Sequence, residues 1–118
     1  MSFGTYFREL RKSKRVTQKQ IADAIGKTTM LISGIETSKN GPFSDEDLKV
    51  VANFLDLTDV EYKALLIQAA NARGKLPPYL LDYISKHSGV YNLLEVLAKK
   101  EMDDASLKKI VMYVEEIE

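Results

Sequence analysis

Residues 17–36 have the sequence TQKQIADAIGKTTMLISGIE, and this stretch decides the fold of the chain. Gln20 follows Thr17 by three positions, which is the spacing of a capping box at the start of a helix. Gly26 is placed to end that helix, because glycine readily accepts the positive φ of a tight turn. Thr28 can cap a second helix. The stretch therefore predicts a helix-turn-helix, two short helices joined by a glycine turn.

The side chains that would hold these two helices together fall at helical spacing. Ala22 is small, so it lets the second helix pack close to the first at a steep angle. The aliphatic residues expected on the facing sides are Ile21, Ile25, Ile32 and Ile35. They predict one rigid unit with a shared apolar interior.

Helical signals dominate the rest of the chain, and no stretch shows the sustained alternation of a strand. We therefore expect an all-α fold. Leu76-Pro77-Pro78 forms the clearest break and predicts two parts, residues 1–74 and residues 75–118. The expected helices are one of about residues 3–14, the two of the motif (the second over about 29–37), one beginning at Ser44, one from Thr58 to Arg73, one around Tyr79–Ile84, one of about residues 90–100, and a last one capped by Asp103 or Asp104.

The charges are distributed unevenly. The chain has 118 residues with 17 basic and 17 acidic side chains, so its formal net charge is zero. Residues 1–40 hold eight basic and three acidic groups, a balance of +5, whereas residues 41–118 hold nine and fourteen, a balance of −5. This asymmetry suggests that the basic part meets a polyanion such as nucleic acid, although a solvated basic helix would give the same count.

Several kinds of chemistry are excluded or disfavoured by composition. The chain has no cysteine, which excludes disulfide scaffolds, zinc ribbons and thiol nucleophiles. We expect the one histidine, His87, to cap helix carbonyls rather than bind a metal. Asp103-Asp104 is read as a helix cap and Glu115-Glu116 as a solvated face. We therefore expect a protein that is not an enzyme, with no catalytic residues, no metal and no cofactor.

The sequence also bears on where the chain resides. No apolar stretch approaches the ~20 residues that a membrane span requires. The N-terminus lacks the apolar segment of a secretion signal, so we expect a cytoplasmic protein that does not enter a membrane.

The motif stretch resembles the helix-turn-helix of phage repressor and Cro-type regulators, the XRE family. The resemblance covers roughly residues 3–70 and implies a five-helix repressor-like DNA-binding domain, here followed by a small C-terminal helical extension. It also implies a palindromic operator in double-stranded DNA as the partner. The residues that carry it are Thr17-Gln18, Ile21-Ala22, Ile25-Gly26 and Ile32-Ser33-Gly34-Ile35-Glu36.

The resemblance assigns roles to individual residues. Arg11 and Glu36 match the internal ion pair of the family. The recognition helix would enter the major groove with its N-terminal residues. The base-facing residues are then Thr29, Met30, Ser33 and Gly34. Phosphate contacts are expected from Gln18, Thr28, Thr37 and Asn40, and from the basic residues Arg8, Lys12, Lys14, Arg15, Lys27 and Lys39.

Some of these roles have alternatives. The basic residues of the first helix could simply be solvated, and Met30 could pack rather than contact the groove. The place of Leu31 is left open, because it could lie in the core, in a dimer contact or exposed to solvent. No Arg, Asn or Gln stands at a base-facing position, so these positions cannot form bidentate pairs with a base. We therefore expect recognition of the DNA sequence that is weaker or depends on DNA shape. Gly34 would permit close backbone approach, and Lys27 or Lys39 could supply a guanine contact.

The C-terminal part has apolar stripes that allow two interpretations. They can close a monomeric core or form a two-fold interface, and we favour a homodimer. The dimerisation residues are then Leu107, Ile110, Val111, Val114 and Ile117. The leading hypothesis is a dimeric repressor of a bacterial or mobile-element operon, since LPPYLLDYI resembles a stretch that follows this domain in some such regulators of Gram-positive bacteria. The alternative is an antitoxin-like or phage-defence module that binds another protein and DNA only secondarily.

Overall fold

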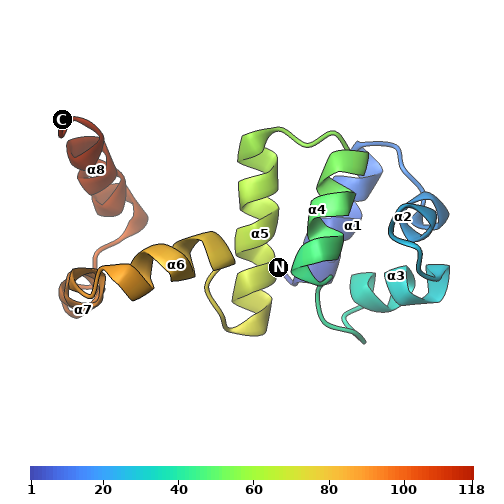
Figure 1. Ribbon diagram of the computed structural model, residues 1–118, viewed down its shortest axis with the longest axis horizontal. Helices are drawn as coiled ribbons and strands as arrows, with labels where there is room; N and C mark the ends of the chain where they lie inside the picture. Colours follow the sequence, from blue (N-terminus) through green and yellow to red (C-terminus); the bar gives the residue numbers. More distant parts are fainter. The chain divides into compact units, whose positions relative to one another are not determined.

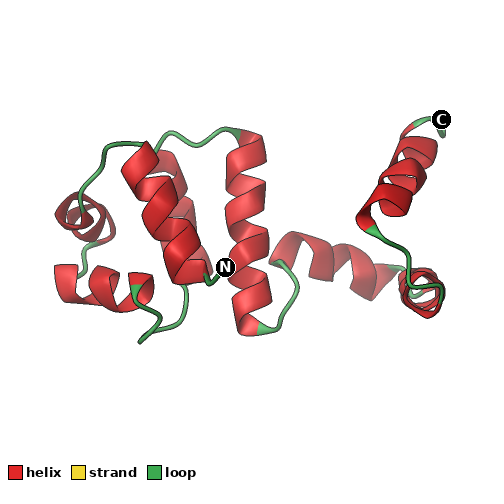
Figure 2. Ribbon diagram, turned by 180° about the vertical axis from the view of Figure 1, so that it is seen from behind, coloured by secondary structure: helices red, strands yellow, loops and turns green.

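The computed structural model describes all residues, 1–118, and contains helices but no strand (Figures 1 and 2). The expected all-α fold is confirmed. The helices are α1 (Phe3–Ser13), α2 (Gln18–Ile25), α3 (Thr29–Glu36), α4 (Asp45–Phe54), α5 (Asp59–Arg73), α6 (Pro78–Lys86), α7 (Gly89–Lys99) and α8 (Asp104–Glu115). None of them is long and apolar enough to cross a membrane.

The chain divides into two compact units, which we call unit 1 (Met1–Pro77) and unit 2 (Pro78–Glu118). The division falls between the two prolines of the Leu76-Pro77-Pro78 break, three residues beyond the boundary expected from the sequence. Unit 1 contains α1 to α5, and unit 2 contains α6 to α8.

Local side-chain caps set where the helices of unit 1 begin. Thr17 accepts a hydrogen bond from the backbone N–H of Gln20 at 3.1 Å, and the Gln20 amide oxygen accepts from the Thr17 N–H at 2.8 Å. Thr58 and Glu61 form the same reciprocal pair at the start of α5. Each box satisfies N–H groups that would otherwise lack a partner in the first turn. These short-range contacts explain why the motif helices begin where the sequence predicts.

The core of unit 1 lies where all five helices meet. Its largest fully buried side chains come from each of them: Phe7, Ile21, Ile32, Leu48, Val51 and Leu65. Phe43, in the loop before α4, packs edge-on against Phe7 with ring centroids 4.8 Å apart. Arg73 at the end of α5 donates to Asp45 and to the carbonyl of Phe43, which ties the end of α5 to the start of α4. This core fixes α3 in the unit.

Unit 2 buries very little. Ile84 is its one buried residue, and α7 and α8 have none. The His87 side chain makes no hydrogen bond to a helix carbonyl, contrary to expectation. Its ring instead lies against Tyr83, with centroids 4.6 Å apart. Unit 2 therefore presents most of its apolar side chains on its surface.

Candidate nucleic-acid interface

The turn between α2 and α3 has the geometry that the sequence predicts. Gly26 is left-handed, with φ 67° and ψ 34°, and exposed. The N–H of Lys27 closes the turn by donating to the carbonyl of Ala22 at 2.9 Å. Thr28 then caps α3, because its hydroxyl accepts from the N–H of Leu31 at 3.2 Å. The result is two short helices held in a fixed crossing.

The inner side of α3 is packed against the rest of unit 1. Ile32 and Ile35 are buried in the core, and Leu31 is half-buried at its edge, which settles its place. Gly4 of α1 lies against the carbonyl groups of Ile35 and Glu36 so closely that a Cβ there would overlap their oxygens. Sequence reasoning missed Gly4, because close approach of two helices distant in sequence leaves no local pattern.

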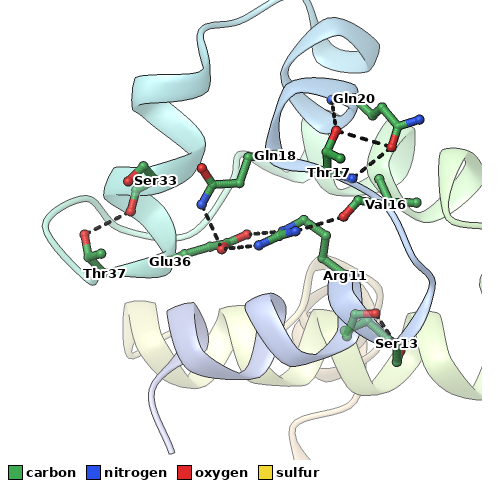
Figure 3. Close-up of polar contacts among 10 residues, drawn as sticks. Arg11, Ser13, Val16, Thr17, Gln18, Gln20, Ser33, Glu36 and Thr37 are labelled. Carbon is green, nitrogen blue, oxygen red and sulfur yellow. Dashed lines mark hydrogen bonds and ion pairs between the residues drawn. The ribbon is translucent and has the colours of Figure 1, made fainter.

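The ion pair expected between Arg11 and Glu36 is present, and it joins α1 to the C-terminal end of α3 (Figure 3). Arg11 Nε donates to Glu36 Oε2 at 2.7 Å and Nη2 donates to Oε1 at 2.9 Å. The remaining donor Nη1 bonds the carbonyl of Val16 at 2.8 Å. Only 9% and 2% of the two side chains are exposed. The hydrogen bonds to Glu36 raise the pKa of Arg11, so the guanidinium group stays charged.

Gln18 joins this network. Its amide nitrogen donates to Glu36 Oε1 at 3.1 Å, and Figure 3 shows the side chain directed toward the ion pair from the start of α2. The predicted phosphate contact of Gln18 would therefore use its backbone N–H or the other amide proton. The sequence gives no signal for this bond, because it joins residues on two helices across the turn.

The outward side of α3 carries three of the four predicted base-facing residues. Thr29 is exposed, Met30 is 82% exposed, and Ser33 is half-buried. The hydroxyl of Thr37 donates to the carbonyl of Ser33 at 2.9 Å at the end of the helix. Met30 does not pack into the core, which contradicts the alternative interpretation that it serves in packing and not in contact with the groove.

Gly34 differs from expectation. It is buried, and the side chain of Asn40 lies over it, so that a Cβ at position 34 would overlap the amide nitrogen of Asn40. The backbone N–H of Asn40 donates to the carbonyl of Gly34 at 3.0 Å. The backbone of Gly34 is therefore not open to close approach, because Asn40 covers it. The two residues are six positions apart and outside any helical spacing, so sequence reasoning missed the contact.

The predicted phosphate-binding cations fall into two groups. Lys14 pairs with Glu61 at 3.1 Å and Lys27 pairs with Asp47 at 3.5 Å. The others are exposed and form no ion pair, and we call them the unpaired cations: Arg8, Lys12, Arg15 and Lys39. These four can bind a polyanion without first giving up an acidic partner.

Two of the segments that carry these contacts have unusual backbone. Arg15 follows α1 with φ 58°, and Ser38 follows α3 with φ 65°, both in the left-handed region. Side chains with a Cβ adopt this region at a cost, which glycine avoids. The turn at Ser38 leads into Lys39 and Asn40 and so decides where they lie.

The predicted dimerisation residues belong to unit 2, on α8 and just after it. Leu107 and Ile110 are half-buried, whereas Val111, Val114 and Ile117 are 54%, 55% and 61% exposed. The structure contains one copy of the chain, and the role of these residues stays a prediction.

Comparison with known proteins gives one match. The family model described as "Helix-turn-helix domain" matches residues 2–65, which is more than half of the chain and runs from the N-terminal cap of α1 into α5. No curated protein and no solved structure shows significant similarity to the chain. The matched range includes the turn at Gly26 and the buried Arg11–Glu36 pair. The chain therefore belongs to the helix-turn-helix domain family, which is associated with XRE-like regulators.

Proposed function

We propose that this protein is a sequence-specific DNA-binding transcriptional regulator, most simply a dimeric repressor of a bacterial or mobile-element operon that acts in the cytoplasm. The observation that carries the proposal is the arrangement of α3. Its inner side is locked by the buried Arg11–Glu36 pair, while its outer side exposes Thr29 and Met30. A rigid helix with a solvent-facing outer side is what major-groove reading requires.

The unpaired cations supply the affinity in this proposal. Phosphate contacts position a protein on the duplex without reading its sequence, and base-edge contacts supply the discrimination. Arg8, Lys12, Arg15 and Lys39 would take the first role. Thr29 and Met30 would take the second through single hydrogen bonds and contact with thymine methyl groups. The protein then acts by occupying DNA, without catalysis.

Selection of bound duplexes from a random library, at stated salt, tests the proposal. A dimer places two α3 helices in successive major grooves, so we expect an enriched inverted repeat with half-sites about 34 Å apart, one turn of DNA. A library that yields no enriched sequence would overturn the proposal.

Two single variants separate the two kinds of contact. Lys39→Ala should weaken binding to all duplexes about equally, because a phosphate contact is blind to sequence. Thr29→Ala or Met30→Ala should alter the preferred base at one position of the half-site. Equal, sequence-independent losses in all three variants would contradict this division of roles.

A second candidate function follows from unit 2. Exposed apolar side chains on α7 and α8 favour an interface, and its other side could be a different protein instead of a second copy. This would make the chain an antitoxin-like or phage-defence module. Sedimentation of the purified chain decides between them: a dimer supports the repressor, and a monomer that binds only half-sites supports the interaction module.

A further inference from the structure

We propose that Asn40, which lies outside the recognition helix, is a base-reading residue of this protein and that it selects adenine in the major groove. The inference rests on the proposed function and deepens it. None of the outward residues of α3 carries the amide or guanidinium that can pair with two atoms of one base. Asn40 would supply such a side chain from outside the helix.

The position of the Asn40 side chain carries the inference. Gly34 follows Met30 by four residues, so the two lie on the same side of α3, one turn apart. Met30 is the most exposed large side chain of that helix, at 82%. A Cβ built at Gly34 would overlap Asn40 Nδ2. The amide therefore occupies the space that a side chain at position 34 would fill, beside the outward face of the recognition helix.

The backbone of Asn40 is held against α3. The N–H of Asn40 donates to the carbonyl of Gly34 at 3.0 Å, and the left-handed turn at Ser38 brings the chain back along α3. Because the backbone at Asn40 is already ordered, binding has to restrict only the side-chain rotamer. Glycine at position 34 is required for this arrangement, because any larger residue would displace the amide.

The polar atoms of the amide are available to a ligand. Asn40 is exposed, and its side chain makes no hydrogen bond within the protein. The amide nitrogen of asparagine can donate to N7 of adenine while the amide oxygen accepts from the N6 amino group, and this bidentate pair is specific for adenine among the four bases. The Asn40 amide next to α3 provides both an NH2 donor and a carbonyl acceptor, whereas Ser33 and Thr37 each provide only one hydroxyl group.

The test is the selection experiment carried out with wild type and three variants. Asn40→Ala should abolish the adenine preference at one base pair of each half-site, with a loss of roughly 5- to 100-fold in discrimination, the range of a bidentate pair. Asn40→Asp has the same shape but only acceptor atoms, so it should lose adenine and gain cytosine at that position. Gly34→Ala should lose the same preference as Asn40→Ala, because the new methyl group displaces the amide.

Lys39→Ala is the matched control, since it should lower affinity for all duplexes and leave the base profile unchanged. Thermal unfolding of each variant confirms that the fold is kept, as the backbone bond from residue 40 to Gly34 does not need the side chain. An Asn40→Ala variant with an unchanged base profile, or with a uniform loss over all sequences, would overturn the inference and leave the proposed function standing. A wild-type protein that enriches no sequence overturns both.

Discussion

Arg11 of α1 and Glu36 of α3 are joined by two charge-assisted hydrogen bonds of 2.7 and 2.9 Å in a nearly solvent-free position. Gln18 of α2 donates a third bond to the same carboxylate. Three helices therefore converge on Glu36. Because both oxygens of this carboxylate are occupied by directed donors, the angle of α3 to α1 and α2 is fixed by bonds as well as by packing.

Removal of one partner from this pair should be far more costly than removal of both. We expect Glu36→Gln to lower the free energy of unfolding by about 3–5 kcal/mol, because it leaves the buried guanidinium without its counter-charge. The double variant Arg11→Met with Glu36→Leu should lose less than the sum of the two single substitutions. Urea unfolding of wild type, Arg11→Met, Glu36→Leu and the double variant gives the coupling energy. Simple additivity would show that the pair is not a coupled unit.

Stability and DNA binding should respond in opposite directions at Arg15. Its φ of 58° is unfavourable for any residue with a Cβ, so Arg15→Gly should raise the free energy of unfolding by about 0.5–1 kcal/mol. The same change removes an unpaired cation and should weaken DNA binding. Arg15→Ala is the control, since it loses the charge but keeps the strained backbone. A lower melting temperature for the glycine variant would contradict this account.

Lys12 and Lys14 provide a matched pair of lysines on and just after α1. Lys12 has no acidic partner, whereas Lys14 lies 3.1 Å from Glu61 and would have to leave that partner in order to bind a phosphate. In plots of log affinity against log salt, Lys12→Ala should reduce the slope by about 1, and Lys14→Ala by clearly less. Equal reductions would mean that Lys14 leaves Glu61 when DNA binds.

Glu61 should make unit 1 sensitive to acid. The hydrogen bond from the Thr58 N–H and then the bond from Lys14 lower the pKa of Glu61 below its ordinary value of 4.5. A carboxyl whose pKa is lower in the folded state adds stability above its unfolded pKa, and this contribution is lost as the pH falls through the folded pKa. Glu61→Gln keeps the cap but cannot titrate.

The unfolding free energies of wild type and Glu61→Gln should therefore differ most near neutral pH and converge well below pH 4.5. Urea unfolding over a series of pH values measures this difference. Lys14→Ala should bring the pKa of Glu61 closer to its ordinary value, which an NMR titration of that carboxyl detects. If the difference in unfolding free energy between wild type and Glu61→Gln does not depend on pH, the titration of Glu61 is not its source.

Association through α8 can be tested at its most central apolar residues. Ile110→Asp and Val114→Asp together should convert a dimer to a monomer in sedimentation, because each places a charge in an interface that excludes water. Lys109→Asp, on the same helix, also introduces an acidic side chain outside the apolar stripe and should leave the mass unchanged. If the paired substitution leaves the mass in sedimentation unchanged, the assignment of the dimer interface to α8 is wrong.

Local signals account for the parts of the structure that the sequence predicts well. Thr17 with Gln20 and Thr58 with Glu61 act within one turn of helix, so their effect can be read from adjacent residues. Gly26 is equally local, since its own φ makes the turn. These signals predict the helices and the helix-turn-helix before any tertiary contact is known.

The contacts that cannot be predicted from the sequence depend on how distant segments of the chain meet. Asn40 reaches Gly34 because Ser38 turns the chain with a left-handed φ, and serine carries no expectation of that conformation. Gly4 is required only because α1 and α3 touch there. The Gln18–Glu36 bond likewise needs the finished crossing of α2 and α3. The outward surface of α3 is therefore harder to predict than the fold beneath it.

The way α3 is held has an evolutionary consequence. Thr29 and Met30 face solvent and contribute no packing to the core, so under the proposed function substitutions there would change the operator without endangering the fold. Gly34 is different, because any larger residue at that position would displace the side-chain amide of Asn40. A lineage can therefore alter its target by a single substitution at Asn40, whereas a substitution at Gly34 also removes the contact that Asn40 makes.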